Sequence, residues 1–152
     1  PRVRRQRQMC IRDSNKYSAN KRILRIWNLT RVTTRLQVFI DNLLEDAYKD
    51  PLSGDTIIYW EDEEKAKDCD FYRINSKRDI LDIPILEVMS AARYAIEQQI
   101  SMPTEDLKRL TSQLLGFSRK GNNLDMVTEQ TIQLLIDKGI FSHANGMVSM
   151  NN

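Results

Sequence analysis

The sequence predicts a mostly α-helical chain with a small β part, in the α+β class. Of the 152 residues, 41% are hydrophobic, which is enough for a packed core in one domain or one domain plus an arm. Apolar residues recur at helical spacing in four segments. Asn145-Gly146 stands between two apolar runs, the strongest short-range signal for a β-hairpin. No apolar run approaches the roughly 18 residues of a membrane span, so we expect a soluble protein.

The basic surplus of the chain lies in residues 1–14. The whole sequence has 23 Lys and Arg against 21 Asp and Glu, and residues 1–14 hold five arginines and one acid. Residues 4–14 (RRQRQMCIRDS) resemble the in-frame translation of a transposase-type sequencing adapter. We therefore expect residues 1–14 to be adapter-derived and disordered, and the rest to be a C-terminal fragment of a longer protein; a natural basic arm or a targeting segment are the alternatives. Without residues 1–14, the chain has 18 basic and 20 acidic residues. The basic pI of the whole sequence is therefore no argument for nucleic-acid binding.

Cysteine usage predicts a reducing compartment, and hence the cytoplasm. Two cysteines and one histidine supply neither a disulfide framework nor the four ligands of a structural zinc site. Reduced thiols are typical of cytoplasmic proteins. Outside residues 1–14 only Cys69 remains, and we expect it to be an inert packing residue.

Residues 15–49 are predicted to hold a strand and an amphipathic helix, as the remnant of an upstream domain. The run 21–29 (KRILRIWNL) is short, rich in Ile, Leu and Trp, and free of Gly and Pro, which favours a strand. Asn28 or Thr30 is the candidate N-cap of the helix, and Asp50-Pro51 its stop. The apolar positions of the helix are Val32, Leu36, Phe39, Ile40, Leu43 and Ala47.

Residues 50–83 are predicted to be an irregular acidic linker. Residues 50–70 contain eight acids and two lysines, whereas residues 15–35 contain six basic residues and no acid. Either the two stretches pair electrostatically or both are solvated faces. The segment has no sustained period, so we expect it to pack through scattered aromatics, namely Tyr59, Trp60, Phe71 and Tyr72.

Residues 84–152 predict three helices and a hairpin. The first helix begins at Pro84 and runs to about residue 99, and Ile100-Ser101 is placed to add a short strand. The second begins near Pro103 and ends at Gly116, a glycine expected at position C′ of a Schellman-type end. The third follows residues 122–123 and stops at Gly139, and the hairpin turns at residues 145–146.

This order predicts a winged-helix-like domain, with residues 116–122 as the turn between its second and third helices. The expected core consists of Leu86, Met89, Ile96, Leu107, Leu110, Leu114, Phe117, Val127, Leu134, Ile140 and Val148.

Patterns of catalytic residues are weak throughout the chain. Residues 116–121 have the glycine spacing of a phosphate-binding loop, but Asn122-Asn123 replace its Lys-Ser/Thr, so we interpret the match as a turn. Asp55 with Glu63-Glu64-Lys65 has the order of a metal-dependent nuclease motif, yet its charged neighbours favour a solvated loop. His143, the only histidine, is expected on the surface of the hairpin. We therefore predict no catalytic, cofactor or metal site in this chain.

Nucleic-acid binding is the alternative function that the fold raises. The third helix exposes mainly carboxylates and amides, and Lys138 is its only basic residue. Residues 84–152 hold six basic against seven acidic residues, which favours a docking or regulatory module over a main DNA grip. The candidate nucleic-acid contacts are Lys108, Arg109, Arg119 and Lys120.

Several motifs together resemble the uncharacterised C-terminal domain of large superfamily-one DNA-helicase-related proteins. They are Asp82-Ile83-Pro84 with Glu87, Gln99-Ile100-Ser101, Asp106-Leu107, the LGFSR run at 115–119, and Gly139-Ile140. Arg25-Ile26-Trp27 and Tyr72-Arg73 resemble the junction of the same family. The resemblance implies a parent that uses ATP and Mg²⁺ and acts on DNA in repair or defence. It further implies that the helicase motors and a very-short-patch-repair-like nuclease domain lie upstream and are the partners of this tail.

Overall fold

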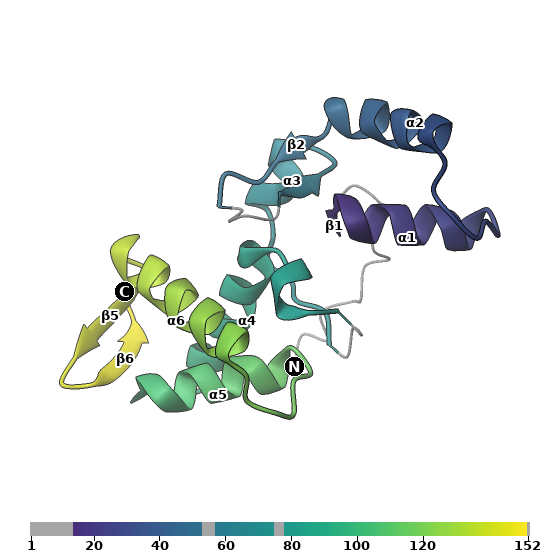
Figure 1. The fold of residues 1–152 in the computed structure, drawn as a ribbon. Helices are drawn as coiled ribbons and strands as arrows, with labels where there is room; N and C mark the ends of the chain where they lie inside the picture. Colours follow the sequence, from purple (N-terminus) through teal and green to yellow (C-terminus); the bar gives the residue numbers. More distant parts are fainter. Residues whose placement is uncertain (1–13, 53–56, 75–77, 152) are drawn as a thin grey trace. The chain divides into compact units, whose positions relative to one another are not determined.

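The computed structural model describes residues 14–52, 57–74 and 78–151. These form two compact units, an N-terminal unit up to Cys69 and a C-terminal unit from Asp70 onward, which we describe separately (Figure 1). Both contain helices and a small antiparallel sheet, so the predicted α+β class is confirmed. In the described part of the chain, no helix is both long and apolar enough to cross a membrane. Of the predicted adapter-derived segment, all but Ser14 lies outside the described residues.

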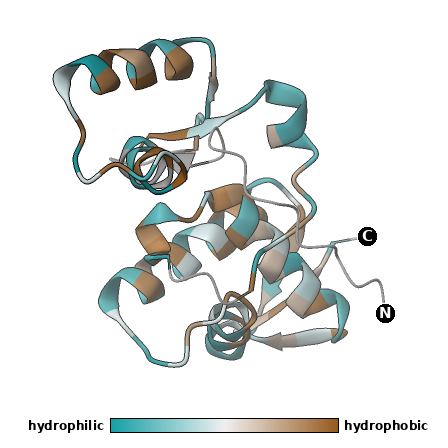
Figure 2. Ribbon diagram, turned by 90° about the vertical axis from the view of Figure 1, so that its right-hand side faces the viewer, coloured by the Kyte–Doolittle hydropathy of each residue, from teal (hydrophilic) through white to brown (hydrophobic). Residues whose placement is uncertain are grey.

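The N-terminal unit pairs two helices and adds a three-stranded sheet. Helix α1 (Lys16–Ile26) packs on α2 (Thr34–Glu45) through a buried cluster. The cluster consists of Ile23, Leu36, Ile40 and Leu44. The sheet has the order β1 (Ser14–Asn15), β3 (Ile58–Trp60), β2 (Tyr48–Lys49), and helix α3 (Glu63–Lys67) follows it. Hydrophobic and hydrophilic bands alternate along α2, the helix at the top of Figure 2, as expected of an amphipathic helix.

The predicted strand at residues 21–29 is wrong, because most of that run belongs to α1. A short apolar run does not distinguish strand from helix by periodicity alone, and here the apolar face of α2 gives Ile23 a helical partner surface. The predicted amphipathic helix is confirmed, but its N-cap is Thr33 instead of Asn28 or Thr30. It also ends at Glu45, before the predicted stop at Asp50-Pro51, because Tyr48–Lys49 form β2. The Thr33 hydroxyl accepts the Leu36 backbone N–H at 3.3 Å.

The stretch 50–83 is not the irregular linker that we predicted. It contains β3, α3 and a 3₁₀ helix, η1 (Ile80–Asp82), and the boundary between the two units falls inside it. Asp50, which is 4% exposed, accepts a hydrogen bond from the Trp60 indole at 3.2 Å. Lys65 and Lys67 pair with Glu61 and Glu63, so the acidic run neutralises part of its own charge at the surface.

The C-terminal unit has three long helices and a second three-stranded sheet. Its elements after η1 are α4 (Ile85–Glu97), β4 (Ser101–Pro103), α5 (Thr104–Leu114), α6 (Asn122–Asp137), β5 (Phe141–Ala144) and β6 (Met147–Met150). Helix α4 packs against both α5 and α6 and against β6. The sheet order is β4, β6, β5, with β6 antiparallel to both neighbours.

The helices α5 and α6 end, and the hairpin turns, at the residues that the sequence predicts. Gly116 (φ +92°) follows α5, and the amides of Gly116 and Phe117 bond the carbonyls of Gln113 and Ser112, the Schellman pattern. Gly139 (φ +70°) ends α6 in the same way. The turn between β5 and β6 has positive φ at both Asn145 and Gly146, as a type I′ hairpin requires.

The core of the C-terminal unit is centred on α4. Val88, Ala91, Ala92, Ala95 and Ile96 are fully buried, so this helix is covered on most of its sides. Of the predicted core, Met89, Ile96, Leu107, Val127 and Val148 are buried. The others are partly buried, namely Leu86, Leu110, Leu114, Phe117, Leu134 and Ile140.

A buried ion cluster fastens the chain before α4 to the helix itself. Glu87, in the first turn of α4, is 0% exposed and faces the guanidinium groups of Arg73 and Arg78. Its Oε1 accepts Arg73 N, Arg73 Nε and Arg78 Nη2 at 2.7, 3.0 and 2.8 Å. Its Oε2 accepts Arg73 Nη2 and Arg78 Nη1 at 2.8 and 3.0 Å. Five donors therefore satisfy one carboxylate, which offsets the cost of burying its charge.

The same cluster sets the protonation of Glu87. Burial alone would raise the pKa of this carboxyl, but the hydrogen bonds from Arg78 and Arg73 outweigh it and hold the pKa below the ordinary value of 4.5. A carboxyl whose pKa is depressed by folding stabilises the folded state above its unfolded pKa. That stabilisation is lost as pH falls through the lower, folded pKa.

Glu87→Gln is expected to lower the free energy of unfolding by about 3–5 kcal/mol at neutral pH, because two buried guanidinium groups lose their counter-charge. Urea unfolding monitored by circular dichroism measures this. Glu97→Gln, an exposed change on the same helix, is the matched control and should stay within about 0.5 kcal/mol. The gap between wild type and Glu87→Gln should narrow as pH falls below 4.5; a constant gap down to pH 3 contradicts the assignment.

Candidate functional site

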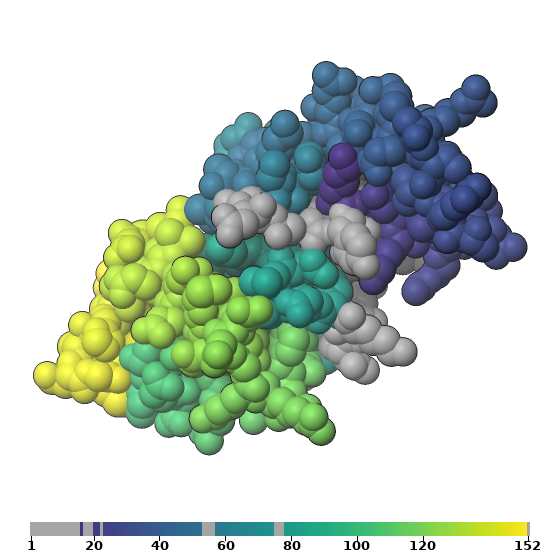
Figure 3. All heavy atoms as spheres, in the orientation of Figure 1, coloured from purple at the N-terminus to yellow at the C-terminus, as the bar shows by residue number. Residues whose placement is uncertain are grey.

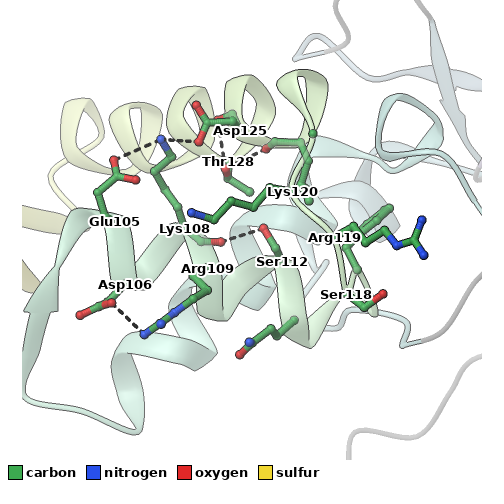
Figure 4. A pocket seen from close by; sticks show the side chains of 14 residues that line it. Glu105, Asp106, Lys108, Arg109, Ser112, Ser118, Arg119, Lys120, Asp125 and Thr128 are labelled. Atoms are coloured by element: carbon green, nitrogen blue, oxygen red, sulfur yellow. Dashed lines mark hydrogen bonds and ion pairs between the residues drawn. The ribbon is translucent and has the colours of Figure 1, made fainter.

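A groove of about 290 Å³ lies between α5, the loop after it and the start of α6. All four predicted nucleic-acid contacts line it, and Figure 4 shows their side chains. Figure 3 shows atoms of α5 and α6, in green, at the molecular surface. The two Schellman ends and the α4 core fix the helices that form its walls. The sequence therefore identified residues that share one surface site.

Lys108 lies on the inner wall and is neutralised inside the protein. Its side chain is 8% exposed, and its Nζ is 2.7 Å from Asp125 and 3.3 Å from both Glu105 and Glu129. Burial alone would lower the pKa of this ammonium, but the hydrogen bonds to the three carboxylates raise it well above its ordinary value. Lys108 therefore stays protonated and links α5 to α6. Because its ammonium is already paired with carboxylates, it is poorly placed to bind a phosphate.

Arg109 is exposed and also has an acidic partner. Its Nη2 donates to Asp106 at 2.8 Å, one turn earlier on α5. Both side chains are more than half exposed, so this ion pair contributes little to the stability of the fold. Arg109 thus lies on the rim of the groove, and its charge is partly neutralised by Asp106.

Arg119 and Lys120 lie in the loop before α6 and differ from the two α5 residues. Both are exposed, and neither forms an ion pair with the described residues. Lys120 extends into the groove toward Lys108, whereas Arg119 points away from it (Figure 4). Arg119 also lines a second, shallower cavity of about 460 Å³ together with η1. The site therefore has two cations available to a partner.

The exposed side of α6 is acidic, as predicted. Its exposed residues include Asp125, Glu129, Gln130, Gln133 and Asp137. Met126, 47% exposed, adds an apolar side chain. Carboxylates repel the phosphate backbone, so this helix is poorly suited to lie in a DNA groove.

The acidic partners of Lys108 were not predicted from the sequence. The Glu105–Lys108 pair has i, i+3 spacing on α5, which is a readable signal. Asp125 and Glu129 lie one turn apart on α6, but their approach to α5 depends on how the two helices cross. Sequence alone does not give that crossing.

The remaining residues that the sequence singled out lie in the N-terminal unit and on the hairpin. Asp55 lies outside the described residues, while Glu63 and Lys65 are exposed on α3. His143 is exposed on β5, as expected. Within the described ranges, no group of three or more His, Cys, Asp or Glu side chains is arranged to hold a metal ion. Cys69 is a partly exposed cysteine.

Comparison of the chain with protein-family models, with curated proteins and with solved structures finds no match.

Lys108→Met should lower the free energy of unfolding by about 1–2 kcal/mol, because the stem still packs but the bonds between α5 and α6 are lost. Arg109→Met, which removes an exposed pair, should change it by less than about 0.5 kcal/mol. Chemical unfolding of both variants measures the difference. If both variants lose the same free energy of unfolding, the result contradicts the role of Lys108 in joining α5 to α6.

Proposed function

We propose that the C-terminal unit is a non-catalytic docking or regulatory module with a winged-helix-type fold. The order α4, β4, α5, α6, β5, β6 and the sheet order β4, β6, β5 support that fold. The short loop between α5 and α6 supports it as well. A shared scaffold does not fix a function, so the proposal rests on the charges of the groove.

The observation that carries this proposal is the internal neutralisation of the groove. Lys108 is held by three carboxylates and Arg109 by one, so half of the candidate DNA-contacting cations are already paired. Phosphate binding gains most of its affinity from cations that release counterions. A face of mixed charge that includes the partly buried Phe117 instead resembles the rim of a protein interface.

The proposed parent is a DNA-helicase/nuclease-related protein that uses ATP and Mg²⁺ and processes DNA in the cytoplasm. This part of the proposal rests on the motif resemblance, from Asp82-Ile83-Pro84 to Gly139-Ile140. The upstream helicase and nuclease domains are then the natural partners of the module. Catalysis belongs to those domains, and this chain has no cofactor of its own in the proposal.

An auxiliary DNA-binding role is the second candidate, favoured by Arg119 and Lys120. They are adjacent, exposed and without ion-pair partners in the described structure. Two phosphate contacts within a larger DNA-bound assembly would orient the module without holding the complex together.

Docking predicts that the recombinant upstream region of the parent binds the full chain, and that Lys120→Glu weakens binding by about tenfold or more. Calorimetry or biolayer interferometry measures the affinity. Lys138→Glu, an exposed charge reversal just beyond the C-terminal end of α6, is the matched control and should bind like wild type. Equal binding by wild type and Lys120→Glu contradicts docking through this groove.

The DNA-binding alternative is tested with the same chain. We expect no change in fluorescence anisotropy of a labelled duplex at about 10 µM protein in low salt, because two free cations give weak non-specific affinity. Salt-sensitive binding that is lost in both Arg119→Ala and Lys120→Ala would establish the alternative and overturn docking as the main role.

A further inference from the structure

A second surface, in the N-terminal unit, combines exposed apolar side chains with arginines that form no ion pair with the described residues. We call it the Trp27 patch and define it as Ile26, Trp27, Leu29 and Phe39, which are 64%, 51%, 44% and 45% exposed. The Trp27 and Phe39 rings contact each other with centroids 5.7 Å apart and planes tilted by 40°. Ile26 ends α1, Trp27 and Leu29 lie in the segment after it, and Phe39 lies on α2; Figure 1 shows that this segment joins the two helices.

The patch is additional to the packing that holds the two helices together. Ile23, Leu36, Ile40 and Leu44 already form the buried cluster between α1 and α2, and each is at most 8% exposed. Scattered apolar residues on a surface are ordinary. Here two aromatic rings contact each other, and Ile26 and Leu29 lie close to Trp27 in the sequence, so the four residues form a patch. Such patches mark interaction sites.

The rim of the patch is positively charged. Arg25 and Arg31 flank Trp27 in sequence, and Arg35 precedes Phe39 by one turn on α2, which places both on one helix face. All three arginines are exposed, and none forms an ion pair with the described residues. No acid occurs between residues 15 and 40. The segment that carries the patch therefore has basic residues and no acid up to residue 40.

We propose that the Trp27 patch docks a segment of a partner protein that combines carboxylates with apolar side chains. Charge complementarity supplies the argument for the carboxylates, because the planar guanidinium group binds them through paired hydrogen bonds. Trp and Arg are also the residue types that most often anchor protein interfaces.

The aliphatic members of the patch favour a peptide over a nucleic acid. Ile26 is the most exposed residue of the patch, and Ile and Leu offer no ring on which a base could stack. Trp27 and Phe39 contact each other, which leaves less ring surface for bases. A peptide with apolar residues on one face and Glu or Asp beside them matches both parts of the surface.

The test uses the full chain and a synthetic amphipathic peptide built from Glu, Leu and Phe. Trp60 is 3% exposed, so a blue shift of tryptophan emission on titration reports burial of Trp27. We expect saturable binding that weakens with added salt. A peptide of the same composition without an apolar face is the control probe and should bind at least about tenfold more weakly.

Variants locate the binding surface. Arg35→Glu and Phe39→Ser should each weaken peptide binding by about tenfold or more, while Val38→Ser, an equally exposed apolar change on α2 outside the patch, should not. Arg35→Glu removes no buried contact, so it keeps the test valid if Phe39→Ser unfolds. Equal loss in Val38→Ser, or no binding of the peptide, overturns the proposal. Tighter binding of single-stranded DNA or of anionic phosphatidylserine vesicles in parallel titrations overturns it too.

Discussion

The carboxylate of Glu87 is the constraint on which the C-terminal unit depends. It is fully buried and accepts five hydrogen bonds from Arg73 and Arg78. One of these donors is a backbone amide, so the cluster fixes main chain as well as side chains. It holds the segment before α4 against that helix, where Ile80 and Ile83 join the core. Residues 70–74 and 78–83 are thus part of the folded unit.

The Glu87 cluster is connected to the candidate site through η1. The 3₁₀ helix contacts α6, and it borders the shallow cavity whose other wall carries Arg119. The groove itself depends on a second charged group, Lys108, which joins α5 to α6. Both clusters use charge to hold elements together, and the second one pairs Lys108, a cation of the groove, with carboxylates of the protein itself.

Much of the fold could be predicted because the signals are local. Gly116, Gly139 and Asn145-Gly146 act through their own backbone angles, and the structure has the expected ends and turn at each. The strand prediction at 21–29 failed because the choice between strand and helix depended on the partner surface of α2. The sequence shows which basic residues are candidates for the site, but it does not show which acidic residues they pair with. Arg73 meets Glu87, and Lys108 meets Asp125, only through tertiary packing.

Amide hydrogen exchange at Arg73 tests the central claim most directly. The claim is that the Glu87 cluster makes residues 70–74 and 78–83 part of one cooperative unit with α4. The Arg73 N–H donates to Glu87 Oε1 at 2.7 Å. We expect this amide to exchange as slowly as the core amides of α4, through global unfolding. Exchange at the rate of an open surface loop, while α4 remains protected, would contradict the claim.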